Sequence, residues 1–210
     1  MALALAPRVG CIILAAGAAR RFGGGKLSAS LRGSPLLQSA IDAACGSRAL
    51  QCTIVLGADA AVVAANIDTR RCTVVVNRAW RRGIASSIAC GVREHDIEDA
   101  CIIALGDQPY VTSTDVDALI EAFARERNAK TRPIVALRAG DVWGAPVLFP
   151  RRDFAALRRL RGDRGAKGLA SANQSRLVFV EAIDRRAFDD VDTKADLTRL
   201  NAPETRRTRP

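Results

Sequence analysis

The stretch from Ile13 to Lys26, ILAAGAARRFGGGK, combines residue types that can hold phosphate groups. Small residues let the backbone approach a ligand, and the glycines at 23–25 permit positive φ, so that amide groups can converge on phosphate oxygens. Arg21 and Lys26 add positive charge that suits a triphosphate. We therefore expect this stretch to cradle the phosphates of a small ligand.

Two familiar phosphate-binding motifs do not account for the stretch. A P-loop needs Ser or Thr directly after its Gly-Lys pair, but Leu27 follows Lys26 and Ser28 comes one place late. The dinucleotide fingerprint GxGxxG is also absent at this turn. An ordinary glycine-rich turn between a strand and a helix is the alternative that the local sequence leaves open.

Two aspartates are candidates for holding a metal ion beside such phosphates. Asp107 comes just beyond an apolar run, and Asp192 lies in the acidic segment FDDVDTKADL. Mg²⁺ usually binds one or two protein carboxylates together with phosphates and waters. From spacing alone, Asp107 could instead cap the next helix, and Asp192 or Thr193 could cap the last one.

Strands and helices alternate around these residues. Short apolar runs rich in β-branched residues predict buried strands at Val9–Ala15, Cys52–Leu56, Cys72–Val76, Cys101–Leu105 and Ile134–Leu137. Segments 36–45 and 114–126 between them have helical periodicity. Such alternation predicts a parallel sheet with right-handed connections and with ligand loops at the carboxyl ends of its strands. Further strands at 147–150 and 176–180 would complete the same domain.

The composition agrees with one α/β domain and narrows the partners. The 210 residues are 49% hydrophobic and only 4% aromatic, which suits helices packed on a β-branched sheet. The net charge of +10 raises the possibility of nucleic-acid binding, but no nucleic-acid motif accompanies it. We expect a small polyanionic ligand and no nucleic-acid partner.

The six cysteines and the one histidine form no pattern that indicates a catalytic or metal site. The six cysteines form no CxxC pair, so we expect free buried thiols in a reducing compartment and no zinc site or redox motif. His95 lies in the polar connection REHDIED, where we expect it to be exposed and to take no part in a catalytic triad.

The two ends of the chain predict neither a membrane segment nor further structure. The N-terminus lacks the charge order of a signal peptide, and no apolar run approaches the ~18 residues of a membrane span. We therefore expect a cytoplasmic protein without membrane contact. Residues 201–210 have no apolar pattern and are expected to be a disordered tail after a single domain over 1–200.

The first stretch resembles the LAAGxSxRxGxxK signature of the MobA-like nucleotidyltransferases, which include molybdenum-cofactor cytidylyl- and guanylyltransferases and sugar-nucleotide pyrophosphorylases. The residues in register are Leu14, Ala15, Ala16, Gly17, Arg21, Gly23 and Lys26. Ala19 replaces the usual serine, which removes one hydroxyl contact. The resemblance implies a three-layer, Rossmann-like domain in which Arg21 and Lys26 are catalytic. It implies nucleotide contacts for those two residues and for Leu14, Ala15, Ala16 and Gly17.

Three further segments are similar to parts of the same family. The GDQP segment implies that Asp107 is catalytic, contacts the nucleotide and binds Mg²⁺. FDDVDTKADL resembles DxDTPxDL, with Lys194 in place of proline, and implies that Asp192 is the second metal ligand. RRGIASSIACGV resembles a helix start whose serine touches the nucleotide, and Ser87 fits best, with Ser86 beside it. A serine that only caps the helix is the alternative.

The segment from Trp143 to Leu169 resembles the branch that acts on molybdopterin. The matching residues are Gly144, Pro146, Phe149, Phe154, Leu157, Leu160, Gly162, Asp163, Gly165 and Ala166. The implied reaction is attack of the cofactor's terminal phosphate on the α-phosphorus of CTP, with pyrophosphate leaving. Ala16 favours CTP because the guanylyl branch tends to read LAGG.

The resemblance leaves several partners and activities open. Basic residues between Arg151 and Lys167 are candidates for holding a phosphorylated acceptor, with a solvated helix face as the alternative. Trp143 is either a stacking platform for a pterin or a core residue. Other activities are guanylyl transfer, cytidylyl transfer to another phosphorylated metabolite, or a non-catalytic chaperone. A molybdenum hydroxylase that receives the cofactor is the implied protein partner.

Overall fold

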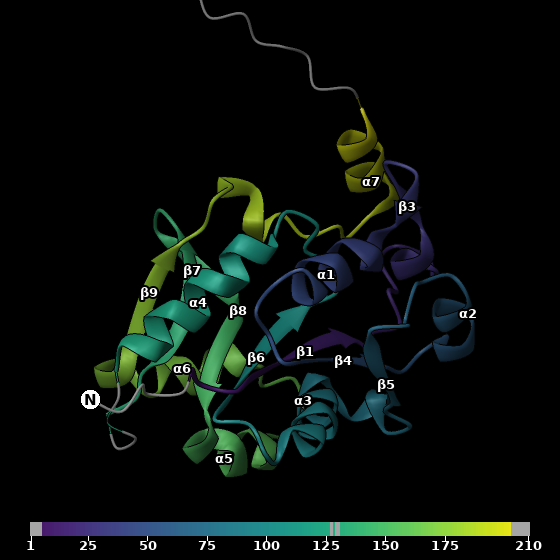
Figure 1. Cartoon of the computed structure of the whole chain (residues 1–210). Coiled ribbons are helices and arrows are strands. Elements are labelled where there is room, and N and C mark those ends of the chain that lie inside the picture. The colour runs from purple at the N-terminus through teal and green to yellow at the C-terminus, as the bar shows by residue number, and fades with distance from the viewer. Residues whose placement is uncertain (1–5, 127, 129–130, 203–210) are drawn as a thin grey trace, which may run out of the picture.

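A seven-stranded sheet forms the centre of the computed structural model, which describes residues 6–126, 128 and 131–202 (Figure 1). The strands lie in the order β5-β4-β1-β6-β8-β7-β9. Their bounds are β1 Val9–Ala15, β4 Gln51–Leu56, β5 Cys72–Val76, β6 Ala100–Leu105, β7 Ile134–Ala139, β8 Val142–Pro150 and β9 Leu177–Glu181. Every neighbouring pair is parallel except the two pairs that contain β8. The mostly parallel α/β sheet expected from the sequence is therefore confirmed.

Strand β8 departs from the expected alternation of strands and helices. It follows β7 after a two-residue turn, in which Gly140 has φ 62, and pairs antiparallel with both β6 and β7. It begins at Val142, whereas the sequence predicted a strand only from 147. The first half of β8 contains Gly144 and Pro146, which break the continuous apolar run that marks a buried strand.

Helices cover both faces of the sheet and make three layers (Figure 1). One buried cluster holds side chains of α1 (Leu36–Cys45), α2 (Ala60–Ala65) and α4 (Ser113–Arg125) against one face. A second cluster holds α3 (Ile84–Val92), α5 (Phe154–Arg159) and α6 (Ala166–Ser171) against the other. Strand β1 is buried over its whole length because it lies between these two clusters.

A smaller apolar cluster holds the last helix beside the loop that follows β1. It joins Leu200 of α7 (Lys194–Asn201) to Phe22 and to Leu31 of the short hairpin β2 (Ser30–Leu31) and β3 (Ser34–Pro35). The expected tail began at residue 201, but Asn201 is the last residue of α7. The remainder of that tail, 203–210, lies outside the described residues.

The expectation that His95 is exposed was wrong, because its side chain is fully buried. Its Nε2 atom is 3.0 Å from Oγ1 of Thr53, and its Nδ1 atom is 3.6 Å from Oε1 of Glu98, which is also buried. Burial lowers the pKa of His95. Gly10 in β1 makes room for the ring, since a Cβ atom there would overlap it.

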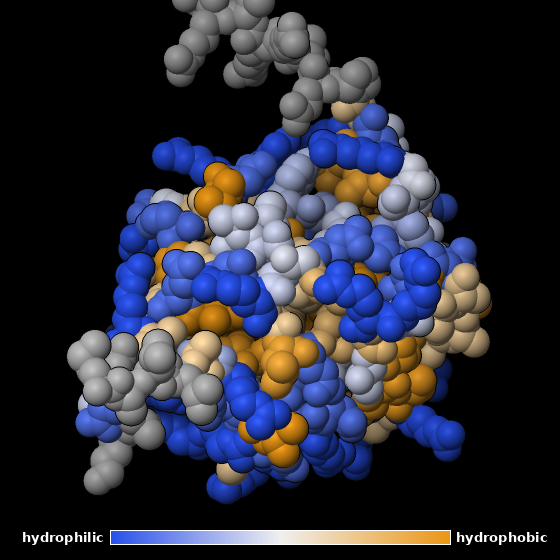
Figure 2. Space-filling view, in the orientation of Figure 1, coloured by the Kyte–Doolittle hydropathy of each residue, from blue (hydrophilic) through white to orange (hydrophobic). Residues whose placement is uncertain are grey.

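Charged and polar side chains cover much of the face seen in Figure 2, with apolar areas between them. Large apolar residues that are exposed include Leu50, Val62, Ile97 and Ile183, which come from different parts of the chain. Scattered apolar residues of this kind are ordinary on a protein surface. Among the described residues, no helix has the length and apolar character needed to cross a bilayer.

Candidate functional site

The loops that follow β1 and β6 leave the sheet at its carboxyl edge, which is the edge where the parallel strands end. β1 lies between β4 and β6, so successive connections diverge here and open a crevice of the kind in which α/β proteins bind ligands. A cavity of about 590 Å³ lies at this edge. The predicted site residues that line it are Leu14, Ala16, Gly17, Arg21, Lys26, Ser87, Asp107 and Asp192. Ala15 instead packs in the buried cluster beneath α1.

The three glycines at 23–25 shape the loop after β1 and do not line this cavity. Gly23, Gly24 and Gly25 have φ of 87, 91 and 65, so the expected positive φ is confirmed. However, the amides of Gly23 and Gly24 donate to the carbonyl of Ala19 at 3.1 and 3.2 Å. These two amides are therefore used within the turn, and the convergence of loop amides on phosphate stays a prediction. Residues 17–21 form the cavity wall in their place.

Lys26 lies between two carboxylates at the carboxyl edge. Its Nζ atom is 2.5 Å from Oδ2 of Asp107 and 3.7 Å from Oδ1 of Asp192. Arg21 makes a second ion pair with Asp192, at 2.8 Å. The side chain of Lys26 is only 11% exposed, so its charge is held close to these carboxylates and largely away from water.

Neither aspartate caps a helix, so that alternative does not hold for either residue. The N-cap of α4 is Thr112, and the N-cap of α7 is Thr193, each in a capping box with an aspartate three residues later. The alternative is therefore correct for Thr193 only. Asp107 and Asp192 face Lys26 instead.

A third carboxylate, Asp190, belongs to the same cluster. Burial raises its pKa, and the nearby charge of Asp107 raises it further. Carboxylate oxygens are the ligands that Mg²⁺ and Mn²⁺ take, and crowded carboxylates favour a divalent cation because it reduces their mutual repulsion. Asp107 and Asp192, which both line the first cavity, therefore have the ligand chemistry that suits such an ion.

Ser87 borders this cavity, whereas Ser86 borders another one. Gly83 is the N-cap of α3 with φ 94, and a Cβ atom there would overlap the backbone of Gly162. Ser87 is buried, and its Oγ accepts a hydrogen bond from Nδ2 of Asn77 at 3.0 Å. Since α3 begins after Gly83, neither serine is its N-cap.

A second cavity, of about 320 Å³, shares a wall with the first through Leu14, Ile84 and Leu105. Trp143 lines it, packed edge-on against Phe179 with 5.4 Å between ring centroids. Lys167 lies over the Trp143 ring, 4.8 Å from its centroid. Trp143 is thus half-buried, with part of its surface towards a cavity.

Gln108 is a residue of this second cavity that the sequence analysis did not single out. Its side chain is 5% exposed, and its Oε1 atom has no hydrogen-bond partner among the described residues. A buried amide oxygen without a partner is costly, so it would be stabilised by a ligand that donates a hydrogen bond. Its position directly after Asp107 was the available signal.

A third cavity, of about 780 Å³, lies between α3 and the chain after α5. Its charged lining residues are all arginines: Arg78, Arg82, Arg93, Arg158 and Arg161. Two of them come from the basic segment 151–167. Without a carboxylate in its lining, this cavity suits an anion and not a metal ion.

Comparison with known proteins relates the chain to nucleotidyltransferases. Nicotine blue oxidoreductase from Paenarthrobacter nicotinovorans is 28% identical over 201 residues, which cover 92% of this chain and 97% of that protein. The crystal structure of Rv0371c from Mycobacterium tuberculosis H37Rv has a TM-score of 0.78 and 28% identity, covering 93% of this chain and 98% of its own. A complex of Rv0371c with manganese has a TM-score of 0.70 and 26% identity, covering 92% and 97%.

The family match extends over most of the sheet. Residues 11–177 match the MobA-like NTP transferase domain, from β1 to the start of β9. Both the loop after β1 and Asp107 fall inside the matched range. The chain therefore belongs to the MobA-like NTP transferase domain family.

Proposed function

We propose that this protein transfers CMP from CTP to the terminal phosphate of a molybdopterin-type cofactor and releases pyrophosphate. The observation that carries the proposal is the position of Lys26 between Asp107 and Asp192, in a cavity at the carboxyl edge. Membership of the NTP transferase family supports the reaction type. The choice of CTP rests on Ala16, and the choice of acceptor rests on the resemblance of the segment from Trp143 to Leu169.

The charges of the site suit a nucleotide that arrives with Mg²⁺. Asp107 and Asp192 would hold the ion, which when bound neutralises charge on the triphosphate. Arg21 and Lys26, no longer paired with those carboxylates, would then bind phosphate oxygens. The manganese complex of Rv0371c supports a divalent ion in a related protein. Ligand binding would thus replace ion pairs within the protein by ion pairs to the ligand.

The proposed chemistry needs no nucleophile from the protein. An oxygen of the acceptor's terminal phosphate forms a bond to the α-phosphorus of CTP, and the bond from that phosphorus to the β-phosphate oxygen breaks. The electron pair leaves with pyrophosphate. Lys26 and Arg21 would stabilise the charge that develops on the leaving group, and Ser87 would help to position the nucleotide.

The cavity beside the nucleotide suits the acceptor. Because the two cavities share a wall, a phosphate in the second would lie near a nucleotide in the first. The Oε1 atom of Gln108 would accept a hydrogen bond from an N–H group of a pterin, and Trp143 would offer it an aromatic surface. A cytoplasmic location and delivery of the product to a molybdenum hydroxylase form part of the same proposal.

Magnesium-dependent pyrophosphate release tests the proposal. The purified protein is given intact molybdenum cofactor with CTP, GTP, ATP or UTP in separate reactions. Release with CTP alone supports cytidylyl transfer, whereas release with GTP would make the protein a guanylyltransferase. If CTP binds but no nucleotide turns over, the activity is cofactor delivery or transfer to another phosphorylated metabolite. Oxidation or reduction of a dye without nucleotide would instead favour the activity in the name of the Paenarthrobacter relative.

A further inference from the structure

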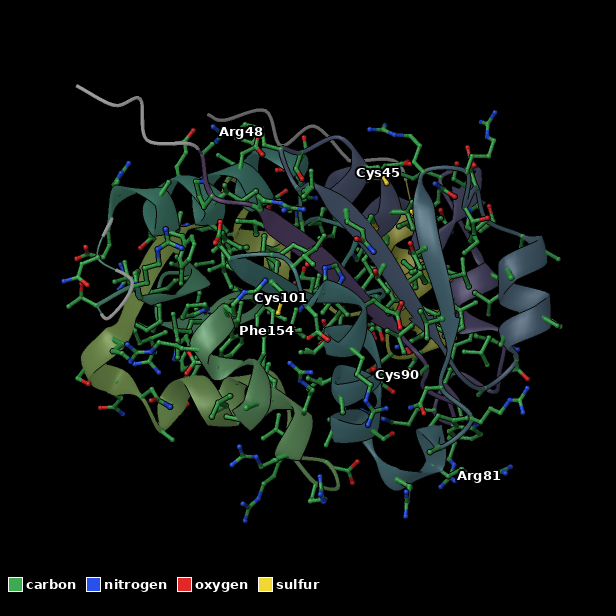
Figure 3. The ribbon with its side chains drawn as sticks, turned by 60° about the horizontal axis from the view of Figure 1, so that its bottom comes forward. Cys45, Arg48, Arg81, Cys90, Cys101 and Phe154 are labelled. Atoms are coloured by element: carbon green, nitrogen blue, oxygen red, sulfur yellow. The ribbon has the colours of Figure 1, made fainter. Side chains whose placement is uncertain are left out.

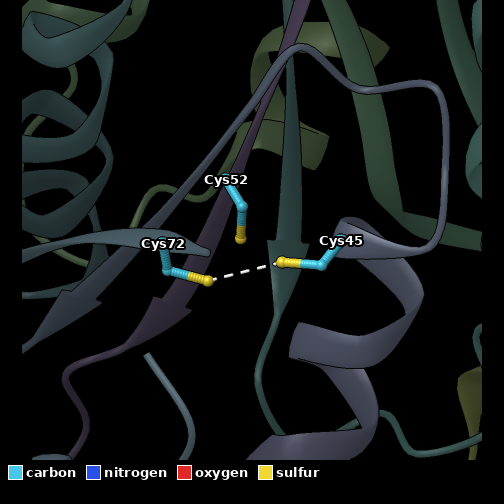
Figure 4. A group of neighbouring side chains, drawn as sticks. All are labelled: Cys45, Cys52 and Cys72. Atoms are coloured by element: carbon cyan, nitrogen blue, oxygen red, sulfur yellow. Dashed lines mark hydrogen bonds between the residues drawn. The ribbon is translucent and has the colours of Figure 1, made fainter. Parts of the chain in front are cut away.

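Three cysteine side chains meet at the amino edge of the sheet. This edge is opposite the carboxyl-edge cavity that contains Lys26 and Asp107. Cys45 ends α1, Cys52 lies near the start of β4, and Cys72 begins β5 (Figure 4). Their sulfur atoms all lie within 4.8 Å of one another. The Sγ atoms of Cys45 and Cys72 are 3.4 Å apart. The three residues form what we call the thiol cluster.

Sheet register and one helix end bring the thiol cluster together. Cys52 and Cys72 are register partners on neighbouring parallel strands, so their side chains project from the same face. Helix α1 covers that face and runs back to the amino edge, where it ends at Cys45. Intervals of seven and twenty residues separate the three cysteines, which match no metal-binding motif.

The expectation of free, separately buried thiols needs correction in two respects. All six cysteines are free of disulfides, as expected, but Cys45, Cys72 and Cys90 are only partly buried. Three thiols are also gathered in one place, where the sequence indicated only isolated residues. Partial burial leaves the cluster open to a ligand from solvent through Cys45 and Cys72, while buried Cys52 closes its inner side.

We propose that Cys45, Cys52 and Cys72 form a binding site for one thiophilic d¹⁰ metal ion, for which Zn²⁺ is the probe. A zinc–sulfur bond is about 2.3 Å long, which in tetrahedral geometry separates two sulfur ligands by about 3.8 Å. The sulfur atoms of Cys45 and Cys72 are 3.4 Å apart, and no two sulfur atoms of the cluster are more than 4.8 Å apart, so the cluster brackets this separation. Thiolate is the ligand that such soft ions prefer.

Binding is balanced by the release of protons. Each thiol loses its proton to water as its sulfur forms a bond to the metal, so that one Zn²⁺ displaces three protons and keeps its fourth position for water. Cys45 lies at the carboxyl end of α1, where the helix dipole favours a cation. The Arg71 guanidinium, which donates to the carbonyl of Cys45, lies close enough to offset the net negative charge of three thiolates and one Zn²⁺.

Metal binding by the full, reduced chain is the first test. Zn²⁺ is titrated in competition with a chromophoric chelator, and Co²⁺ is used as a spectroscopic substitute. We expect one ion per chain and a cobalt spectrum with sulfur-to-metal charge transfer of several thiolates. Stoichiometry below one, or a cobalt spectrum without thiolate ligands, would overturn the proposal.

Single substitutions assign the ligands. Cys45→Ser and Cys72→Ser should each weaken zinc binding by about 100-fold. Loss of a residue that only supports a metal ligand already lowers metal affinity by up to about 100-fold. Cys90→Ser is the matched control, because Cys90 is also partly buried but belongs to α3, on the other face of the sheet (Figure 3). Equal zinc affinity in all three variants would exclude the cluster as the site.

Alkylation of the unmutated protein keeps the test independent of mutant folding. Zn²⁺ should protect the partly exposed Cys45 and Cys72 from iodoacetamide, as read by mass spectrometry, and leave Cys90 as reactive as before. Equal protection of Cys90, or no protection of Cys45 and Cys72, would refute the proposal. None of these measurements uses nucleotide, so their failure is separate from a failure of the proposed function.

Discussion

At the carboxyl edge of the sheet, Lys26 lies between two carboxylates on loops, whereas at the amino edge three thiols project from two strands and a helix end. The first group is charged and already internally paired, so a ligand must replace contacts that exist. The second group is held by strand register and has no charge until protons leave. Loops suit a site whose partners exchange during a reaction, and strands suit a site whose ligands stay in place.

The largest effect is expected for a substitution that removes the chemistry of the carboxyl edge alone. Asp107→Ala should lower turnover by about 10³-fold or more, because a carboxylate that faces Lys26 would be lost from the reacting centre. Pyrophosphate release measures the effect, and thermal unfolding should show that the fold is kept. Asp68→Ala is the control, since Asp68 pairs with Arg70 on the surface. Full activity in Asp107→Ala would remove this residue from the site.

The next effect belongs to the amino edge and should leave turnover unchanged. Zn²⁺ at about 100 times its dissociation constant stabilises a protein by about 2.7 kcal/mol. For a chain of this size, that corresponds to a rise in Tm of about 5–11 °C. Cys45→Ser should lose most of the rise and keep its rate of pyrophosphate release. If Cys45→Ser loses both the rise in Tm and the rate of pyrophosphate release, the two edges are not independent.

A smaller effect should distinguish the two cavities at the carboxyl edge. Gln108→Leu removes the buried oxygen without a partner and should raise the KM for the acceptor about tenfold, equivalent to about 1.4 kcal/mol, with no change in the KM for CTP. Steady-state kinetics with each substrate varied in turn measures this. If only the KM for CTP rises, Gln108 belongs to the nucleotide cavity instead.

The smallest effect is expected at His95, which packs against Gly10 near the amino end of β1. Burial lowers its pKa in the folded state, so the unfolded chain binds the proton more readily. Stability should therefore be fully present above the unfolded value of about 6.5 and should fall as pH drops through the folded pKa. Urea unfolding between pH 8 and pH 5 measures the loss. His95→Asn should show a weaker dependence over that range, and an identical dependence would assign it to other groups.

The carboxyl edge could be predicted from the sequence because its signals are local. Lys26 ends a contiguous glycine-rich stretch, and Asp107 follows β6 after one glycine, so each could be placed from its neighbours in the chain. Strands β1 and β5 were predicted with the bounds that they have in the structure. Residue roles at this edge stay predictions until the variants above are measured.

The amino edge and the buried histidine depend on contacts between distant segments. Cys52 and Cys72 come together through strand register, and no local pattern specifies which residues of two strands will be partners. His95 is surrounded in the sequence by charged residues that made the segment look exposed, and the space for its ring comes from Gly10. The first half of β8 was missed for a different, local reason, because a glycine and a proline interrupt its apolar pattern.

The contact between Gly10 and His95 also constrains the order in which the sequence can evolve. Any side chain at position 10 would overlap the imidazole, so replacement of the glycine is harmful while the histidine is present. Replacement of His95 by a smaller residue first would leave a gap that a later alanine at position 10 could fill. The two positions are therefore epistatic, and lineages can pass from this pair to another through the histidine but not through the glycine.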